Sequence, residues 1–329
     1  MAKKRGSLAL GVDLGGSKIL AGAVDAKNQV LGRGKVVTPF AGSAEDLTAA
    51  LLEACSTALA EAGATPEDVE AIGVSVPGPL DAEKGVLLRA AHLAVKDYSV
   101  PKAFGTAYPG VPVALENDVR MAAYGEAHLG AGKGVETLVA IWVGTGVGGA
   151  VIHRGRLWSG RNRNAGEVGH MYLDFRKAQP GAERGSLEDH AGKVGMSGWM
   201  RRRIEEGEKT ALAKAVTRKG RLKSSELKKA FEGGDELTQR AVARSARAVG
   251  LAMANIFDVL SPDLFVLGGG VAQELGAPYI EEVTKWARAF AFTTELGDVE
   301  VAPAALGDDA GILGAGLYAR LAASKRRRS

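Results

Sequence analysis

The sequence predicts an α/β protein with two similar domains that face each other across a cleft. A strand, a glycine-rich turn and a second strand begin each half of the chain, and helical patterns follow both hairpins. Such an internal echo is typical of two related α/β units. Because no proline- or serine-rich segment separates the halves, we expect a hinge between them instead of a flexible tether.

The N-terminal half begins with a predicted antiparallel meander. An apolar run closes at Gly15-Gly16, and strands are expected to follow at 18–24 and 29–37. Ser43 is expected to cap a helix that ends near residue 62, with acidic residues in its first turn. The other elements predicted in this half are strands at 69–76 and 111–115 and a helix at 118–129.

The second half repeats the pattern. Strands at 137–143 and 148–152 flank a glycine turn, a long helix runs from 235 to about 260, and a short strand follows at 264–267. The closing helix, 309 to about 321, is expected to pack back on the first domain. The predicted domains are therefore 1–118 with 306–329, and 119–305.

Composition excludes several classes of protein. The 45 glycines among 329 residues are about twice the average share, and they cluster after apolar strands. The single cysteine, Cys55, excludes an internal disulfide and lies in an alanine-rich pattern that favours a buried hydrophobe. No apolar run is long enough to cross a membrane, and the N-terminus resembles a first strand more than a signal peptide. We expect a cytoplasmic protein.

The net charge of +4 is unevenly spread, with basic residues at both ends and across 201–229. Nucleic-acid contact is one interpretation of that stretch. Its apolar residues have helical spacing, however, which favours amphipathic helices with a solvated basic face. The residues expected to point inward are Leu212, Val216, Leu222, Leu227 and Phe231.

Two glycine turns are candidates for binding phosphate. Backbone amides unobstructed by Cβ atoms form anion-binding concavities, although a single glycine hairpin is more often plain turn chemistry. The turns occupy equivalent places in the two halves, and the first carries an acid and a lysine. Asp13 is expected to hold the Mg²⁺ of a nucleotide through water. The turn residues are Gly15, Gly16, Ser17 and Lys18 in the first half, and Gly144, Thr145 and Gly146 in the second.

A third glycine turn, which includes Gly269 and Gly270, follows a short buried strand and precedes a helix. Such a place suits an adenine ring, which needs close approach of the backbone. A plain strand-to-helix connection is an equally good interpretation of the turn alone.

Asp118 is the candidate catalytic base. Phosphoryl transfer depends mostly on positioning and electrostatics, with a carboxylate accepting the proton of the acceptor hydroxyl. Glu116, Asn117 and Asp118 leave a buried strand and enter a helix, which places them at a rigid, open edge. Helix capping by Asn117 or Asp118 is the alternative interpretation, but capping does not require three polar residues together.

Further carboxylates and an imidazole follow at Glu167, His170 and Glu188. Hydrogen-bonding groups of this kind suit a sugar with vicinal hydroxyls. His170 taken alone, beside apolar residues, is more often a structural histidine.

In family order, seven motifs resemble those of the ROK (repressor, open reading frame, kinase) family of sugar kinases, from about Leu8 to the last helix: DLGGSK, SVPGPLD, VALEND, GTGVGG, AGEVGH, GSLE and LGGGV. The resemblance implies an actin/hexokinase-like (ribonuclease H-like) fold and transfer of the γ-phosphate of Mg-ATP to a hexose, with glucose the first choice. It implies that Asp118 is the base and that Asn117, Glu167, His170 and Glu188 bind sugar, with Gly78 at the border of the sugar cleft. It also implies a homodimer.

Two departures from the family pattern matter. Many members carry a CxCGxxGCxE zinc motif, but this chain has Gln179, Gly181 and Ser186 at the cysteine positions. Because His170 alone cannot hold the metal, we expect no structural zinc; a substitute site from His170, Asp189 and His190 is the alternative. Arg163 stands where the family usually has glycine and is expected to reshape the sugar pocket.

Three functions follow for comparison. The first is an ATP-dependent sugar kinase of the glucokinase type, with N-acetylhexosamine or fructose as other acceptors and polyphosphate as another donor. The second is a sugar-responsive regulator, disfavoured because too few residues precede the first strand for a DNA-binding module. The third is a sugar sensor without turnover, disfavoured because every acid assigned to the chemistry is present.

Overall fold

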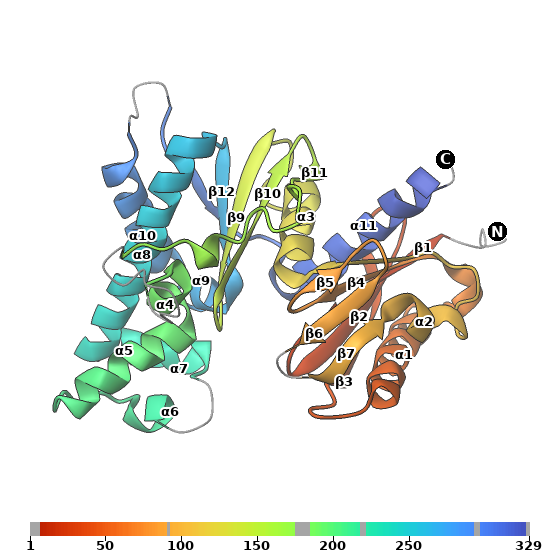
Figure 1. Cartoon of the computed structure of the whole chain (residues 1–329), viewed down its shortest axis with the longest axis horizontal. Helices are drawn as coiled ribbons and strands as arrows, with labels where there is room; N and C mark the ends of the chain where they lie inside the picture. The colour runs from red at the N-terminus through yellow and green to blue at the C-terminus, as the bar shows by residue number, and fades with distance from the viewer. Residues whose placement is uncertain (1–6, 91–92, 175–184, 218–221, 293–296, 327–329) are drawn as a thin grey trace. The chain divides into compact units, whose positions relative to one another are not determined.

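The structure of the chain is a computed structural model that describes residues 7–90, 93–174, 185–217, 222–292 and 297–326 (Figure 1). The chain divides into two compact units, residues 1–126 with 306–329 and residues 127–305. Each unit has its own five-stranded mixed sheet and its own hydrophobic core. The first unit includes most of the helix that begins at Asp118, to Glu126; the domain boundary expected from the sequence lies at residue 118.

The sheet of the first unit has the strand order β3-β2-β1-β4-β8. Strands β1, β2 and β3 form the expected antiparallel meander, and β4 and β8 add to it in parallel with β1. Parallel pairing brings the carboxyl ends of β1, β4 and β8 to one edge of the sheet. The bounds are β1 (Leu8–Leu14), β2 (Lys18–Val24), β3 (Val30–Val37), β4 (Val69–Val76) and β8 (Val113–Asn117).

Helices cover both faces of this sheet, and glycines set how closely they approach. Gly34 of β3 lies against the backbone of α1, while Gly73 of β4 lies against the carbonyl of Ala315 in α11. Helix α1 begins at the expected cap, where Ser43 accepts the N–H of Asp46. The helices are α1 (Ala44–Glu61), α3 (Asp118–Leu129) and α11 (Ala310–Arg326), with the 3₁₀ turns η1 (Pro66–Asp68) and η4 (Gly307–Asp309).

A second, three-stranded sheet in the first unit was not predicted. It runs in the order β5-β6-β7 and leads directly into helix α2, whose first turn contains Pro101. Strand β5 has only two residues, and Lys96 and Asp97 interrupt the apolar pattern of β7, so this sheet does not show the regular alternation from which strands are recognised. The bounds are β5 (Leu80–Asp81), β6 (Val86–Ala90), β7 (Leu93–Ser99) and α2 (Val100–Gly105).

The sheet of the second unit repeats the plan of the first, in the order β11-β10-β9-β12-β13. Strands β9, β10 and β11 are antiparallel neighbours, and β12 and β13 continue the sheet in parallel with β9. The predicted echo between the two halves is therefore confirmed at the level of strand pairing. The bounds are β9 (Thr137–Val143), β10 (Val147–His153), β11 (Arg156–Leu157), β12 (Leu264–Gly268) and β13 (Val301–Pro303).

The long helix α8 (Glu236–Leu260) supplies much of the second core. Asp235 caps it by accepting the N–H of Thr238, and it ends at Ser261, which is left-handed and precedes Pro262. In the basic stretch, Leu212, Val216, Leu222 and Leu227 are buried and Phe231 is partly buried, as the amphipathic interpretation predicted. The other elements are η2 (Val168–His170), α4 (Leu187–Ala191), α5 (Lys193–Glu205), α6 (Ala213–Thr217), α7 (Ser224–Glu232), α9 (Gly269–Leu275) and α10 (Ala277–Phe290).

Within the described ranges, no helix is long and apolar enough to cross a membrane. Cys55 is fully buried on α1, and burial raises the pKa of its thiol to about 12. The burial of Cys55 matches the expectation from composition.

Gly73→Ala tests the close approach of α11 to β4. A Cβ atom at residue 73 would overlap the carbonyl group of Ala315, and because both partners are backbone, the helix would have to move. We expect the free energy of unfolding to fall by about 1 to 3 kcal/mol in urea titration. Gly105→Ala is the control: no atom lies near its Cβ position at the end of α2, so stability is expected to hold or rise slightly. Equal stability of the two variants would contradict this packing.

Candidate active site

In the first unit, polar residues gather where three parallel strands end. Asp13 of β1 lies opposite Ser75 of β4, and Val76 of β4 lies opposite Asn117 of β8. Asp118 follows at once as the first residue of α3. The edge formed by the carboxyl ends of parallel strands is the usual ligand-binding edge of an α/β sheet. Gly78 follows β4 at this edge and has a positive φ of 91° that suits glycine.

Asp13 is a partly buried carboxylate held in place by Ser75, whose hydroxyl donates to Asp13 Oδ1. Burial raises the pKa of Asp13, and the hydrogen bond from Ser75 and the charge of Lys18 only partly oppose this. Gly311 of α11 lies close against the Asp13 carboxyl group, and a Cβ atom there would crowd it. Sequence reasoning missed Ser75, because nothing local marks a serine inside an apolar strand.

The sequence left open whether Asn117 or Asp118 caps helix α3, and the structure separates the two residues. Asn117 Oδ1 accepts the N–H of Arg120 at 3.2 Å, which is the N-cap contact of α3, so the cap is Asn117. Asp118 Oδ1 accepts from Asn117 Nδ2 and from the N–H of Val119, both at 2.9 Å. Both hydrogen bonds therefore anchor the same carboxylate oxygen, which leaves Oδ2 as the candidate acceptor for a ligand.

The electrostatics of Asp118 suit a base. Burial and the negative charge of Asp13 raise its pKa from 3.8 to about 6, although the hydrogen bonds to Asp118 act in the opposite direction. The carboxyl group therefore ionises just below neutral pH, where a general base is most effective. Two carboxylates whose pKa values are both raised also favour a cation beside them, and hard oxygen ligands are those that Mg²⁺ prefers. These residues therefore fit the magnesium ion of a nucleotide.

A buried ion pair lies beside these residues. Arg120 Nε is 3.1 Å from Glu116 Oε1, and each side chain is only 3% exposed. Glu116 Oε1 also accepts the N–H of Asn117 at 3.1 Å. Because breaking a buried pair leaves an uncompensated charge, the pair holds the junction of β8 and α3 firmly. Sequence reasoning noted Glu116 but not its partner.

The first glycine turn is a tight connection with exposed amides. Gly15 donates its N–H to the carbonyl of Lys18 at 3.0 Å, while the Thr38 hydroxyl donates to the Gly15 carbonyl at 2.7 Å. Gly16 and Ser17 at the tip are exposed, so their backbone can be approached from solvent. Lys18 Nζ forms an exposed ion pair with Asp308 at 2.9 Å, a partner that lies 290 residues away and carries no local signal.

In the second unit, the helices α4 and α5 hold the glycine turn between β9 and β10. Glu188 Oε2 accepts the N–H of Val147 at 2.9 Å and lies against Gly146, where a Cβ atom would strike it. Lys193 donates its backbone N–H to the carbonyl of Gly144 at 3.0 Å, and the next residue bonds to the carbonyl of Thr145. One oxygen of Glu188, predicted as a sugar ligand, therefore supports the turn.

Glu167 precedes η2, His170 is the last residue of η2, and both are exposed. The segment packs beside the glycine turn, because Gly169 lies against the carbonyl of Val147, and Leu187 donates its N–H to Met171 at 2.8 Å. The second unit therefore brings the segments of Glu167, His170, Glu188 and Gly146 together.

The third glycine turn lies at the same edge of the sheet. Gly268 pairs with Trp142 at the end of β9, and Gly269, with a φ of 85°, lies against Val143. Gly270 approaches Ser224, whose hydroxyl accepts from Lys193 Nζ at 3.1 Å. Sequence reasoning missed both Lys193 and Ser224. Lys193 lies beside the turn at Gly144, a candidate for binding phosphate, and Ser224 lies beside Gly270 of the candidate adenine turn.

Two positions that depart from the family pattern, Arg163 and Ser186, lie in different kinds of local structure. Arg163 is left-handed, with a φ of 60°, a conformation that favours glycine. Ser186 caps α4 together with Asp189, whose carboxylate accepts the Ser186 hydroxyl, and His190 faces Arg244. No group of three metal-ligating side chains occurs among the described residues; positions 179 and 181 lie outside them.

Comparison with known proteins gives the family. The model of the ROK family matches residues 9–322, and the chain belongs to that family. It is 27% identical over 309 residues to a glucokinase of Halalkalibacterium halodurans, with 93% of each chain covered. The crystal structure of a ROK hexokinase from Thermus thermophilus has a TM-score of 0.80 and 34% identity, covering 97% of this chain and 99% of that one.

A ROK family glucokinase from Streptomyces griseus, solved in complex with glucose and AMPPNP, has a TM-score of 0.79 and 29% identity, covering 95% of this chain and 99% of its own. The expected two-domain actin/hexokinase-like fold is confirmed by these neighbours.

Asp118→Asn is predicted to stabilise the free protein at neutral pH. The pKa of Asp118 is about 6 in the folded protein, above its ordinary value of 3.8. Above pH 6 the ionised carboxylate therefore lowers the free energy of unfolding. An amide keeps the Oδ1 acceptor and removes the charge, so the free energy of unfolding at pH 8 should rise by about 1 to 3 kcal/mol.

The difference should shrink as the pH falls from 6 to 4, because the wild-type carboxyl group becomes protonated in the folded state. Urea titrations at pH 8 and pH 4.5 measure both values. Asp97→Asn, at an exposed left-handed position that asparagine tolerates, controls for the change in charge. A less stable Asp118→Asn variant at pH 8 would contradict the raised pKa.

Proposed function

We propose that the chain transfers the γ-phosphate of Mg-ATP to a hydroxyl group of a hexose, with glucose as the first candidate and Asp118 as the general base. An ATP-dependent sugar kinase is the enzyme class that the family and the relatives support. The observation that carries the specific proposal is the state of Asp118. Its Oδ1 is anchored by two hydrogen bonds, its Oδ2 is left as the candidate acceptor, and its pKa is raised to about 6.

In this proposal Asp118 Oδ2 accepts the proton of the sugar hydroxyl as the hydroxyl oxygen attacks the γ-phosphorus. The bond from the γ-phosphorus to the bridging oxygen of ATP breaks, and ADP leaves. Asn117 orients the carboxylate through its Nδ2 donor, and the Glu116–Arg120 pair keeps the junction rigid. Positioning of this kind contributes much of the rate in phosphoryl transfer, since the protein forms no covalent bond itself. Asn117 is also assigned a contact to the sugar through its remaining amide hydrogen.

The donor is assigned to the glycine turns. The exposed amides of Gly16 and Ser17 and the turn of Gly144, Thr145 and Gly146 are proposed to contact phosphate oxygens. Lys18 adds positive charge to the first turn. Asp13 is the residue proposed to hold Mg²⁺ through water, and the bound ion would supply positive charge to the transferring phosphate. Gly269 and Gly270 are proposed to border the adenine.

The acceptor is assigned to Glu167, His170 and Glu188, with Gly78 at the border of the sugar site. Glu188 has one oxygen committed to Val147, so it can offer the other to a hydroxyl. Arg163 stands near these residues in sequence, and its departure from glycine makes it the first candidate for altering the choice among glucose, fructose and N-acetylhexosamines. We propose further that the protein is a cytoplasmic homodimer that binds neither specific nucleic acid nor structural zinc.

The proposal predicts sugar-dependent formation of ADP by the wild-type protein. A panel of hexoses and N-acetylhexosamines with Mg-ATP should give at least one acceptor, and replacing ATP by polyphosphate identifies the donor. With the best acceptor, Asp118→Asn should lower kcat about 10²- to 10⁴-fold, the usual contribution of a general base. Asp97→Asn should leave kcat unchanged.

Sugar-dependent heat stabilisation without any ADP would support the sensor function instead. Near wild-type turnover by Asp118→Asn would contradict the assigned base.

A further inference from the structure

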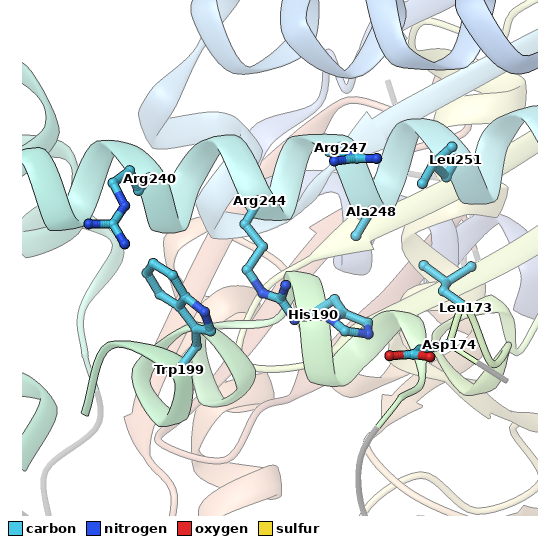
Figure 2. Close-up of a pocket in the computed structure, with 9 residues that line it drawn as sticks. All are labelled: Leu173, Asp174, His190, Trp199, Arg240, Arg244, Arg247, Ala248 and Leu251. Atoms are coloured by element: carbon cyan, nitrogen blue, oxygen red, sulfur yellow. Dashed lines mark hydrogen bonds between the residues drawn. The ribbon is translucent and has the colours of Figure 1, made fainter. Parts of the chain in front are cut away.

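Three arginines on one face of α8 line a pocket that shares no residue with the candidate active site (Figure 2). The pocket has a volume of about 670 Å³ and lies wholly within the second unit. Its lining residues are Arg240, Arg244, Arg247, Ala248 and Leu251 of α8, His190 of α4, Trp199 of α5, and Leu173 and Asp174.

The arginines form a row along the helix. Residues 240, 244 and 247 recur at helical spacing and therefore lie on one face of α8. Figure 2 shows the side chains of Arg240 and Arg244 extending from α8 toward Trp199 and His190. Arg247 follows Arg240 by seven positions, which correspond to about 10 Å of helix axis. A row of this length exceeds a single phosphate group, so it suits a ligand with anionic groups at two or more positions.

The lining is strongly unbalanced in charge, because Asp174 is its only carboxylate. Arg240 is paired with Glu208 at 2.6 Å, a residue outside the lining. Arg247 lies over the ring of Trp286, 4.6 Å from its centroid, and makes no ion pair within the described part of the chain. The positive charge of the pocket is thus only partly compensated by the protein.

Arg244 is the central group of the row. Its side chain reaches from α8 to His190, and its Nε is buried without a hydrogen-bond partner among the described residues. Burial and the nearby charge of Arg202 lower the pKa of Arg244, although Asp174 opposes them. A buried donor without an acceptor is costly, and an anion that accepts from it would remove that cost.

We propose that this arginine pocket binds a small ligand that carries at least two phosphate groups. Guanidinium groups match phosphate oxygens in a bidentate manner, and the row offers them at both ends. The volume lies in the range of small-molecule sites, which favours a metabolite over a segment of another protein. An inorganic oligophosphate and a sugar bisphosphate share this chemistry.

Calorimetric titration of the full chain tests the pocket directly. The probes are tripolyphosphate, fructose 1,6-bisphosphate and inorganic phosphate, each in the presence of excess AMPPNP so that nucleotide-binding residues are occupied. Tripolyphosphate or the bisphosphate should bind at one site per chain, at least about tenfold more tightly than inorganic phosphate. The tighter of the two identifies the source of the ligand, and its affinity should fall with added salt.

Variants locate the binding. The double substitution Arg240→Gln and Arg247→Gln removes two exposed charges and should weaken binding at least tenfold. The double substitution Arg154→Gln and Arg156→Gln, on the exposed β10–β11 hairpin, makes the same change in charge and should alter affinity less than twofold. Circular dichroism confirms that both variants are folded.

The proposal would be overturned by no saturable binding of either multivalent probe, by equal weakening in the two double variants, or by equally tight binding of inorganic phosphate. A change in sedimentation of the pocket variant without a change in phosphate binding would assign the arginines to a contact between copies of the chain, and would also overturn it.

Discussion

The burial of two carboxylates, Asp13 and Asp118, at the ends of parallel strands is the constraint on which the candidate site of the first unit depends. Burial raises the pKa of both groups, and the charge of Asp13 raises that of Asp118 further. The protein tolerates this cost because strong local contacts hold each group: Ser75 binds Asp13, and Asn117 with the N–H of Val119 binds Asp118. Strain of this kind is typical of functional sites, where a ligand relieves it.

The strand order of the first unit places these polar residues at one edge of its sheet. Parallel pairing of β1, β4 and β8 sets Asp13, Ser75 and Asn117 at neighbouring positions, and α11 closes over Asp13 through Gly311. Close packing of this helix depends on Gly73, which leaves room for its backbone. The second unit uses the same strand plan for a different purpose, since its hairpin turn is supported by Glu188 and its parallel strand ends in a glycine turn.

Local pattern was sufficient for the parts of the molecule that depend on local physics. Apolar periodicity located the meander and α8, and capping chemistry located the start of α1 at Ser43. It was not sufficient for β5 to β7, because β5 has two residues and the charged residues of β7 interrupt its alternation. It also left the cap of α3 undecided between Asn117 and Asp118, because both residue types cap helices and only the side-chain direction separates them.

Contacts distant in sequence were beyond prediction for a different reason. Ser75 and Asp308 reach Asp13 and Lys18 only through the fold, and the arginine row of α8 becomes a pocket only when α4 and α5 cover it. Nothing in the neighbouring sequence of these residues reports the partner. Motif order, by contrast, singled out Asp13 and Asp118 as candidates, because both stand in motifs that resemble those of the family.

The most direct test of this account is the titration of the Asp118 carboxyl carbon by NMR in the free protein, with Asp118→Asn used for assignment. We expect the pKa of Asp118 to be about 6 in the wild type and clearly lower in Asp13→Asn, because the neighbouring negative charge is gone. A wild-type pKa near the ordinary 3.8, or a raised value unchanged by Asp13→Asn, would contradict the coupling of the two carboxylates.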